Sequence, residues 1–117
     1  MVFQSVLSSL CQSIRGVQGA LMLDAAGEVV VESQGSDERL RLIGAYHGIA
    51  LATARKAAER YETGEIEYLV SRHAWGTVVS RPLKDSYYFV ISLGPNAPVA
   101  LAVHRSGLAQ QQLNAEI

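Results

Sequence analysis

The first apolar residues of the chain recur with the spacing of a helix. They stand at i, i+3, i+4, i+7 and i+11: Phe3, Val6, Leu7, Leu10 and Ile14. This spacing places them on one side of an α-helix. Gly16 follows directly and is a typical helix stop. The pattern therefore predicts an amphipathic helix that ends before Gly16.

Two short apolar runs come next, at residues 19–23 and 29–31, and the second is β-branched. Between them, Asp24 and Gly27 are typical of a tight turn, so the segment predicts a β-hairpin. We expect the Asp24 carboxylate to bond the turn backbone, because no second carboxylate is placed to share acid–base chemistry with it.

A long helix is predicted from Ser36 to Tyr61. Ser36 is the expected N-cap, and Thr63-Gly64 is the expected end. A helical wheel gathers one main apolar face: Leu40, Ile43, Tyr46, His47, Ala50, Ala54, Ala57 and Tyr61. On that face, His47 is interpreted as a hydrogen-bonded core histidine rather than a ligand.

Three strands are predicted after this helix. Residues 65–71 alternate, with Ile66, Tyr68 and Val70 on one face. Residues 77–79 form a strand that leads to Pro82, a residue that cannot donate to a ladder. Residues 87–93 are apolar on both faces and predict a central strand.

The last segment fits two structures. Asn96 could cap a helix over 97–115, which we favour, although Val99, Leu101 and Val103 could equally alternate along a sixth strand. With the helix, the order is α-ββ-α-βββ-α. All strand connections are short, so we expect an α+β fold with a five-stranded antiparallel sheet and helices packed on it.

Composition limits the class of protein. The chain has 117 residues, of which 49% are hydrophobic, and we expect a single domain over 1–117. Its formal charge of −1 lacks the basic excess of a nucleic-acid-binding domain. The uncharged, apolar-rich stretch 42–54 is too short to span a membrane. We therefore expect a cytoplasmic protein without nucleic-acid partners or membrane insertion.

Candidate chemistry is sparse. The single cysteine, Cys11, excludes an internal disulfide and is interpreted as a small buried hydrophobe. The three histidines are scattered, without metal-ligand spacing. The chain has no G-x-S-x-G elbow and neither of the glycine-rich phosphate loops. We expect no enzyme, no metal and no cofactor.

Three segments of the chain resemble the Roadblock/dynein light chain family. They are Gly16-Val-Gln-Gly-Ala-Leu-Met-Leu-Asp-Ala-Ala-Gly27, Gly64-Glu-Ile-Glu-Tyr-Leu69 and Pro82-Leu-Lys-Asp-Ser-Tyr-Tyr-Phe-Val-Ile91. The resemblance covers most of the chain and implies the Roadblock or profilin-like topology. The tail from Arg105 to Leu108 looks like bacterial members.

The family resemblance implies a function. Members are mostly small dimeric platforms that bind Ras-like GTPases, so it implies a non-enzymatic homodimer that regulates a small GTPase, in the manner of a GTPase-activating protein or otherwise. One alternative is a structural adaptor of a larger complex with no effect on GTP hydrolysis. Another is a profilin- or longin-like sensor of a small ligand. The identity of the GTPase stays open.

A dimer interface has candidate residues in two places. On the helix, Leu42 and Ile49 fall outside the main apolar stripe, while small residues recur every four positions: Gly44, Gly48 and Ala52. These small residues allow close approach of either a second chain or the chain's own sheet. Ile66 and Tyr68 belong to the strand that family dimers pair, and Glu65 and Glu67 fit either an exposed edge or a solvent-facing side of a paired strand.

A partner surface is expected where cations gather. Arg55, Lys56 and Arg60 form a basic group near the end of the long helix. Arg72 and His73 stand in the expected turn between the third and fourth strands. Each could be an ordinary solvated residue, and together they are the candidate contacts for an acidic partner surface.

Overall fold

The computed structural model describes residues 2–33 and 35–117. These residues form, in order, α1 (Val2–Ser13), β1 (Val17–Leu23), β2 (Val29–Glu32), α2 (Glu38–Tyr61), β3 (Leu69–His73), β4 (Gly76–Pro82), the short 3-10 helix η1 (Lys84–Ser86), β5 (Tyr88–Leu93) and α3 (Val99–Asn114). This order confirms the predicted α+β fold class and decides the open question about the tail in favour of a helix.

The strands form one sheet in the order β2-β1-β5-β4-β3, and every neighbouring pair is antiparallel. β5 stands at the centre and is buried along its whole length, as its two-sided apolar pattern predicts. β2 and β3 are the two edges of the sheet.

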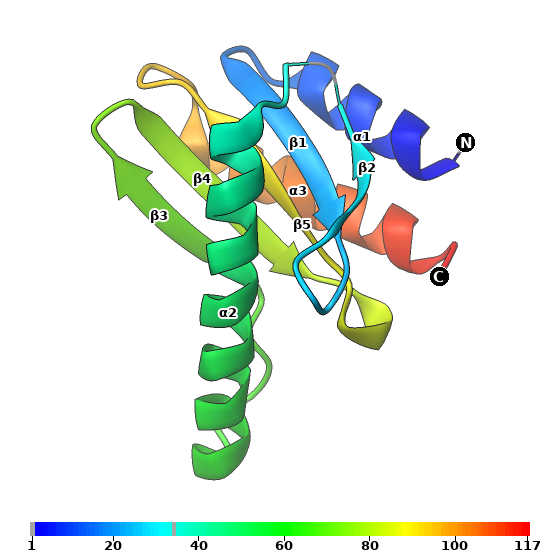
Figure 1. Ribbon diagram of the computed structural model, residues 1–117, viewed down its shortest axis with the longest axis vertical. Coiled ribbons are helices and arrows are strands. Elements are labelled where there is room, and N and C mark those ends of the chain that lie inside the picture. The colour runs from blue at the N-terminus through cyan, green and yellow to red at the C-terminus, as the bar shows by residue number, and fades with distance from the viewer. Residues whose placement is uncertain (1, 34) are drawn as a thin grey trace.

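Helices cover both faces of the sheet (Figure 1). α2 packs on one face over a core of Leu21, Leu23, Leu40, Leu51, Val78, Tyr88 and Val90. α1 and α3 pack side by side on the other face, over a larger core that includes Leu7, Leu10, Met22, Val79, Phe89, Ile91 and Leu113. The result is a three-layer arrangement in which the sheet separates α2 from the helix pair.

The β1–β2 hairpin forms as predicted. Asp24 Oδ1 accepts hydrogen bonds from the backbone N–H of Ala26 and Glu28, both at 3.0 Å. Gly27 adopts a φ of +79°, which favours glycine. The carboxylate of Asp24 therefore has the structural role expected of it.

α2 ends at Tyr61 as predicted but begins at Glu38, and the residues that cap it differ from those predicted. Asp37, not Ser36, is the N-cap, and its carboxylate accepts from Leu40 N–H at 2.9 Å. Ser36 instead donates to the Ala20 carbonyl at 3.0 Å. At the other end Glu62 takes the left-handed conformation, and Thr63 N–H bonds the Ala58 carbonyl at 3.1 Å.

The predicted main apolar face of α2 is only partly the buried one. The buried residues of this helix are Leu40, Gly44, His47, Leu51 and Ala58. Tyr46 and Tyr61, assigned to the buried face, are exposed. The helical wheel placed the apolar face too close to the tyrosines, because glycine carries no hydrophobic signal. Gly44 in fact lies at the centre of the contact between α2 and the sheet.

β3 begins later than predicted, at Leu69 instead of Glu65. Leu69 pairs with Ser80, and continuing this register would place Glu67 opposite Pro82. Proline has no N–H to donate, so the ladder ends there. Residues 65–68 therefore run outside the sheet, and β4 is longer than the predicted 77–79.

The helix at the end of the chain has an unexpected start. Asn96 does not cap it; Pro98 is the N-cap residue and makes no side-chain cap bond. Proline fits there because the first helical N–H groups need no partner within the helix.

Candidate functional site

β3 is an open edge of the sheet. It pairs with β4 without a register shift from Leu69↔Ser80 to His73↔Gly76, and no further strand lies beyond it in the described part of the chain. Such an edge presents a row of backbone groups that another strand can pair with.

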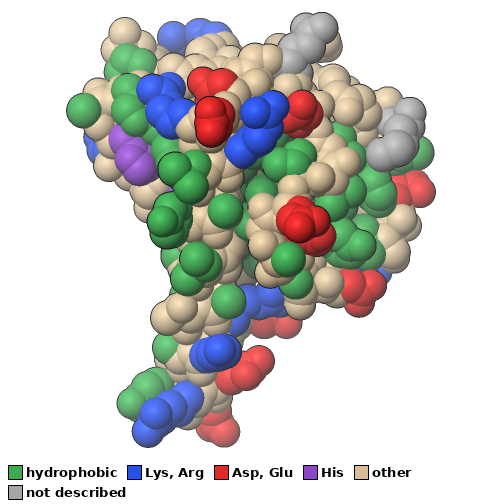
Figure 2. Space-filling model, in the orientation of Figure 1, with side chains coloured by type: hydrophobic (Ala, Val, Ile, Leu, Met, Phe, Trp, Pro, Cys, Tyr) green, Lys and Arg blue, Asp and Glu red, His purple; other side chains and the backbone are tan. Residues whose placement is uncertain are grey.

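Exposed apolar side chains lie beside this edge. On α2, Leu42, Tyr46 and Ile49 stand at i, i+4 and i+7 with 59%, 63% and 62% of their surfaces exposed. On or next to β3, Tyr68 and Val70 are also exposed. Figure 2 shows hydrophobic side chains gathered along α2. We call Leu42, Tyr46, Ile49, Tyr68 and Val70 the exposed apolar set. Because Leu69 and Ser71 face α2, Tyr68 and Val70 lie on the opposite side of β3, so the set flanks the edge on both sides. Exposed apolar residues on both sides of an open edge favour an interaction there.

A network of hydrogen bonds between side chains joins α2 to β3 and β4. His47 Nδ1 lies 2.6 Å from Ser80 Oγ, and His47 Nε2 lies 2.7 Å from Ser71 Oγ. Ser71 Oγ in turn lies 2.8 Å from His73 Nε2. Burial lowers the pKa of His47, and the neighbouring His73 lowers it further. His47 is thus a satisfied, buried histidine, as predicted.

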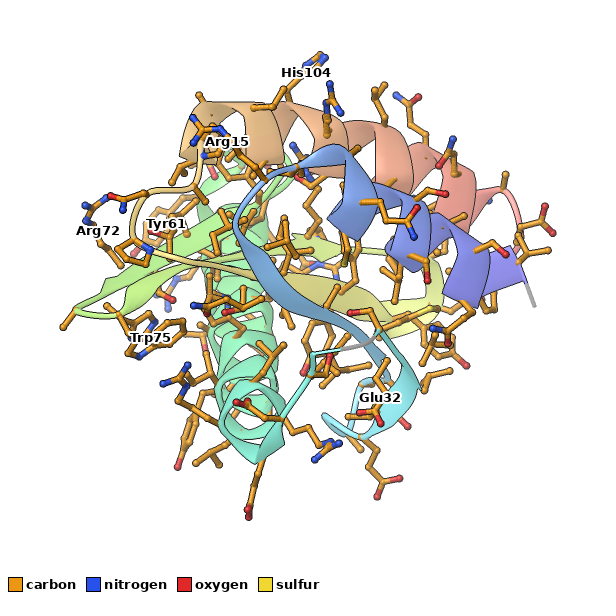
Figure 3. The ribbon with its side chains drawn as sticks, turned by 90° about the horizontal axis from the view of Figure 1, so that it is seen from above. Arg15, Glu32, Tyr61, Arg72, Trp75 and His104 are labelled. Atoms are coloured by element: carbon orange, nitrogen blue, oxygen red, sulfur yellow. The ribbon has the colours of Figure 1, made fainter. Side chains whose placement is uncertain are left out.

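The hydrogen-bond network leads to a stack of three side chains at the β3–β4 turn. The His73 ring stacks on Trp75, with centroids 4.9 Å apart, and the Arg39 guanidinium lies 4.1 Å from the Trp75 centroid. The stack fixes the position of the β3–β4 turn relative to the start of α2. Trp75 is labelled in Figure 3, together with Arg72 of β3.

The structure divides the predicted partner-surface cations into two groups. Arg55, Lys56 and Arg60 lie on the part of α2 that projects beyond the sheet (Figure 1), where Ala58 is the only buried residue after Leu51. Arg72 and His73 lie on β3, and His73 is half-buried. His73 is held by Ser71 and Trp75 and so has a structural role as well.

The glycines predicted as interface candidates face the chain's own sheet. A Cβ at Gly44 would lie 3.4 Å from side-chain atoms of Leu23 and Val90, and one at Gly48 would lie 2.6 Å from Cζ of Tyr88. Of the two alternatives for Gly44 and Gly48, packing on the chain's own sheet explains their spacing. Ala52 is exposed, and Ile66 is half-buried against the α2-side core.

Tyr88 of β5 explains why the backbone of α2 lies so close to the sheet. Its hydroxyl donates to the Gly44 carbonyl at 2.9 Å and lies under Gly48. Burial and the nearby Asp24 raise the pKa of Tyr88 to about 12, which keeps the phenol a donor.

Arg81 is a buried cation that the sequence analysis missed. It donates to Ser106 Oγ and to the Val103 carbonyl, both at 2.8 Å, and its guanidinium lies 5.0 Å from the Tyr68 ring centroid. Burial lowers its pKa, and Glu67 opposes that shift. Nothing in the sequence around Arg81 indicates that its side chain packs against α3, because its partners there are distant in sequence.

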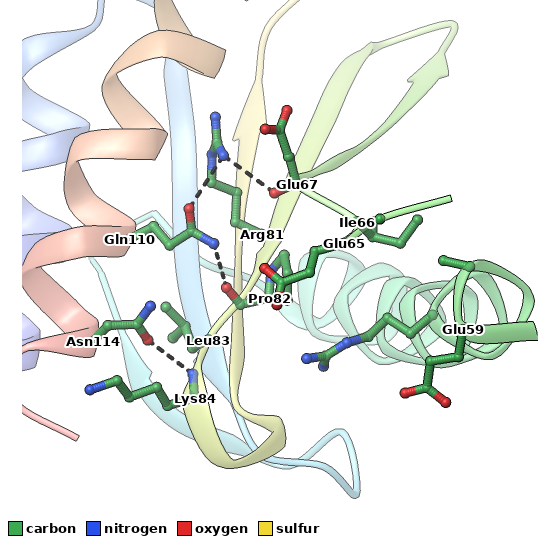
Figure 4. A pocket seen from close by; sticks show the side chains of 13 residues that line it. Glu59, Glu65, Ile66, Glu67, Arg81, Pro82, Leu83, Lys84, Gln110 and Asn114 are labelled. Carbon is green, nitrogen blue, oxygen red and sulfur yellow. Dashed lines mark hydrogen bonds between the residues drawn. The ribbon is translucent and has the colours of Figure 1, made fainter. Parts of the chain in front are cut away.

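A cavity of about 650 Å³ lies between the projecting end of α2, residues 64–67 and the end of β4 (Figure 4). Its wall mixes cations with carboxylates: Arg55, Arg81, Lys84, Glu59, Glu65 and Glu67. Gln110 and Asn114 of α3 tie its floor to the backbone of Pro82 and Lys84. Apolar residues also line it, namely Ala58, Ile66, Pro82 and Leu83. Most small-molecule sites are more apolar and less charged than this mixed lining.

Two further properties bear on function. Among residues 2–33 and 35–117, no group of three or more His, Cys, Asp or Glu is arranged to hold a metal ion. In the same residues, no helix is long and apolar enough to cross a membrane. Cys11 is partly buried, and its thiol, whose pKa burial raises, lies 3.6 Å from Ser33 Oγ.

Solved structures share this fold. A Roadblock/LC7 domain from Streptomyces avermitilis superposes with a TM-score of 0.84 at 16% identity, covering 97% of this chain and 95% of that chain. Myxococcus xanthus MglB gives 0.82 at 12% identity, with 97% and 92% covered. Acanthamoeba castellanii profilin II gives 0.64 at 15% identity, with 97% and 98% covered. At these identities the similarity concerns the fold.

Sequence comparison supplies the family. The comparison with curated protein sequences gave no match. The family model of the Roadblock/LC7 domain matches residues 4–92, which include α1, the whole sheet almost to its last residue, and α2. The chain therefore belongs to the Roadblock/LC7 family.

Proposed function

We propose that the protein is a non-enzymatic regulator that acts in the cytoplasm as a homodimer and binds a small Ras-like GTPase. The observation that carries the proposal is the open edge of β3 beside the exposed apolar residues of α2. Two copies joined at β3 form one continuous sheet and cover Leu42, Tyr46 and Ile49 of both chains. Membership of the Roadblock/LC7 family supports this mode of association.

The GTPase binds, in this proposal, on the α2 side of the dimer. Arg55, Lys56 and Arg60 stand on the projecting end of α2. Arg72 lies outside this surface, because its neighbours Ser71 and His73 are the β3 residues on the α2 side. A cationic surface of this kind attracts an acidic partner surface and speeds the encounter. A regulator that binds one nucleotide state more tightly shifts the GTPase toward that state, without supplying a catalytic group itself.

Binding to purified GTPases tests the proposal. Each Ras-like GTPase of the source organism is loaded with GDP or with a non-hydrolysable GTP analogue, and binding to the protein is measured by calorimetry. We expect one GTPase to bind with an affinity that differs at least about tenfold between the two nucleotides. If none binds in either state, the proposal fails.

A double substitution and a matched control test whether the cations of α2 make the contact. Lys56→Glu with Arg60→Glu is expected to weaken GTPase binding about tenfold or more while the dimer stays intact. Arg15→Glu is the control, because Arg15 is exposed at the end of α1, on the other side of the sheet. Equal affinities for the two nucleotide states would favour the adaptor alternative instead.

A further inference from the structure

α1 and α3 form a groove on the face of the sheet opposite α2. The helices run antiparallel: Arg105 of α3 donates to the Ser13 carbonyl at the end of α1 at 2.6 Å, whereas Val2 lies at the other end beside Glu116. Two adjoining hollows of about 450 and 440 Å³ lie along the pair, and they share Val6, Ser9 and Gln112.

The surface of this groove is almost free of charge. α1 contains no charged residue, and α3 contains only Arg105. The other charged residues of the chain lie outside these two helices. Exposed helices of a soluble protein normally carry many charges, whereas the centres of protein interfaces are depleted of them.

Apolar side chains line the groove between polar rims. Leu10, Leu101 and Leu108 line one hollow and Val2 the other, and Leu108 and Val2 are 51% and 50% exposed. The rims are serine, glutamine and histidine: Ser5, Ser9, Ser13, His104 and Gln112. An apolar floor with neutral polar walls is the surface that receives the apolar side of an amphipathic helix.

The two ends of the groove differ in charge. Arg105 and His104 lie where α1 ends, and Glu116 lies where α1 begins. His104 is labelled on α3 in Figure 3. A helix in the groove is therefore favoured in one direction, with its negative carboxyl end at Arg105 and its positive amino end at Glu116.

We propose that the α1–α3 groove is a docking site for an amphipathic helix of a second partner protein, with apolar residues at i, i+3, i+4 and i+7 and acidic residues in its last turn. A second copy of this chain fits less well, because it would offer the same concave groove rather than a ridge. Since the sheet lies between this groove and α2, the helix and the partner proposed for α2 can bind at the same time.

A pair of designed peptides tests the site. Both are stapled helices with leucines at i, i+3, i+4 and i+7 on a glutamine background; one has two glutamates in its last turn and the other has the same two glutamates in its first turn. Binding to the full chain is measured by fluorescence anisotropy. We expect the first peptide to bind at least about fivefold more tightly than the second, and amide shifts from its binding to concentrate in α1 and α3.

Two variants on α1 give the matched comparison. Ser9→Arg places a charge inside the groove and is expected to weaken binding of the first peptide at least about tenfold. Gln12→Arg adds the same charge to the same helix outside the groove lining and is expected to leave it unchanged. Circular dichroism and oligomeric mass verify that both variants keep the fold and the assembly of the parent chain. Absence of binding, equal binding of the two peptides, or unchanged binding to Ser9→Arg would each overturn the proposal, and none of these results concerns the GTPase.

Discussion

The two edges of the sheet are built differently. β2 is four residues long, and its register shifts between Met22 and Leu23. The Gln4 amide donates to the Glu32 carbonyl at 2.8 Å, and the Glu32 carboxylate pairs with Arg41 at 2.9 Å. Short length, irregular register and charge are the features by which natural sheets discourage strand addition.

β3 is only one residue longer than β2 and carries the exposed Arg72, so length and charge do not separate the two edges. Its five residues pair with β4 in unbroken register, and exposed apolar side chains stand on both sides of it. β2 also exposes Val29 and Val30, so exposed apolar surface alone does not distinguish the edges. What distinguishes them is a regular backbone edge next to an apolar helix surface, and the proposed dimer forms at this edge.

The largest expected effect comes from charging the surface beside β3. Tyr46→Asp with Ile49→Asp places two carboxylates on the side of α2 that the dimer would cover. Both positions are mostly solvent-exposed in the single chain, so the fold is expected to persist. We expect the dimer dissociation constant, measured by analytical ultracentrifugation, to rise more than about a hundredfold, or roughly 3 kcal/mol.

Val30→Asp at the other edge is the control for this comparison. Val30 is 43% exposed on β2, so the substitution adds one carboxylate to an exposed apolar position of the other edge. The dimer dissociation constant is expected to stay within about twofold of the parent value. A comparable loss in both variants would show that the two edges do not differ in the way described.

The glycines of α2 provide the next test. Gly48→Ala would push a methyl group against the Tyr88 ring, and we expect it to lower the free energy of unfolding by about 1–3 kcal/mol despite the better helix propensity of alanine. Gly44→Ala makes contacts of 3.4–3.5 Å and is expected to be tolerated. Urea unfolding measures both. A stable Gly48→Ala chain that fails to dimerise would restore these glycines to the interface.

The hydrogen-bond network of His47 predicts that the stability of the fold depends on pH. Because the pKa of His47 is lower in the folded than in the unfolded chain, the unfolded chain binds more protons near and below 6.5, the ordinary histidine value. Stability is therefore expected to fall as the pH drops through that value. His47→Gln should flatten this dependence and cost about 1–2 kcal/mol at neutral pH by loosening the bonds to Ser71 and Ser80. Thermal unfolding across the pH range measures both effects. An equally steep pH dependence in the variant would show that a group other than His47 causes it.

The smallest effect is expected at the protected edge. Arg41→Ala removes a salt bridge whose two side chains are each 45% exposed. Exposed pairs contribute little, so we expect a loss of less than about 0.5 kcal/mol in urea unfolding and no change in oligomeric mass. A loss of dimer in this variant would place the contact at β2.

The fold was largely predictable because its signals are local. Periodic apolar residues, Gly27 in the turn and the two-sided apolar run of β5 each determine an element from nearby positions. The start of β3 was not predictable in this way. The ladder begins at Leu69↔Ser80, and the register that would bring Glu67 opposite Pro82 is known only once the two strands are aligned.

The candidate site was less predictable for the same reason. Glycine has no hydropathy signal, so the buried side of α2 was centred toward Tyr46 instead of Gly44. The Ser71 and Ser80 partners of His47 come from two other strands, and their positions become meaningful only when the sheet is assembled. Leu42 and Ile49 could be selected because they fall outside the main stripe, and the structure places both at the surface.

Amide hydrogen exchange at two protein concentrations tests the central claim most directly, because it reports on both edges in one sample. If a second chain adds to β3, the amides of Leu69–His73 gain protection as concentration rises through the dimer range, while those of Val29–Glu32 do not change. Protection that is independent of concentration at β3, or that rises at β2 instead, would contradict the account.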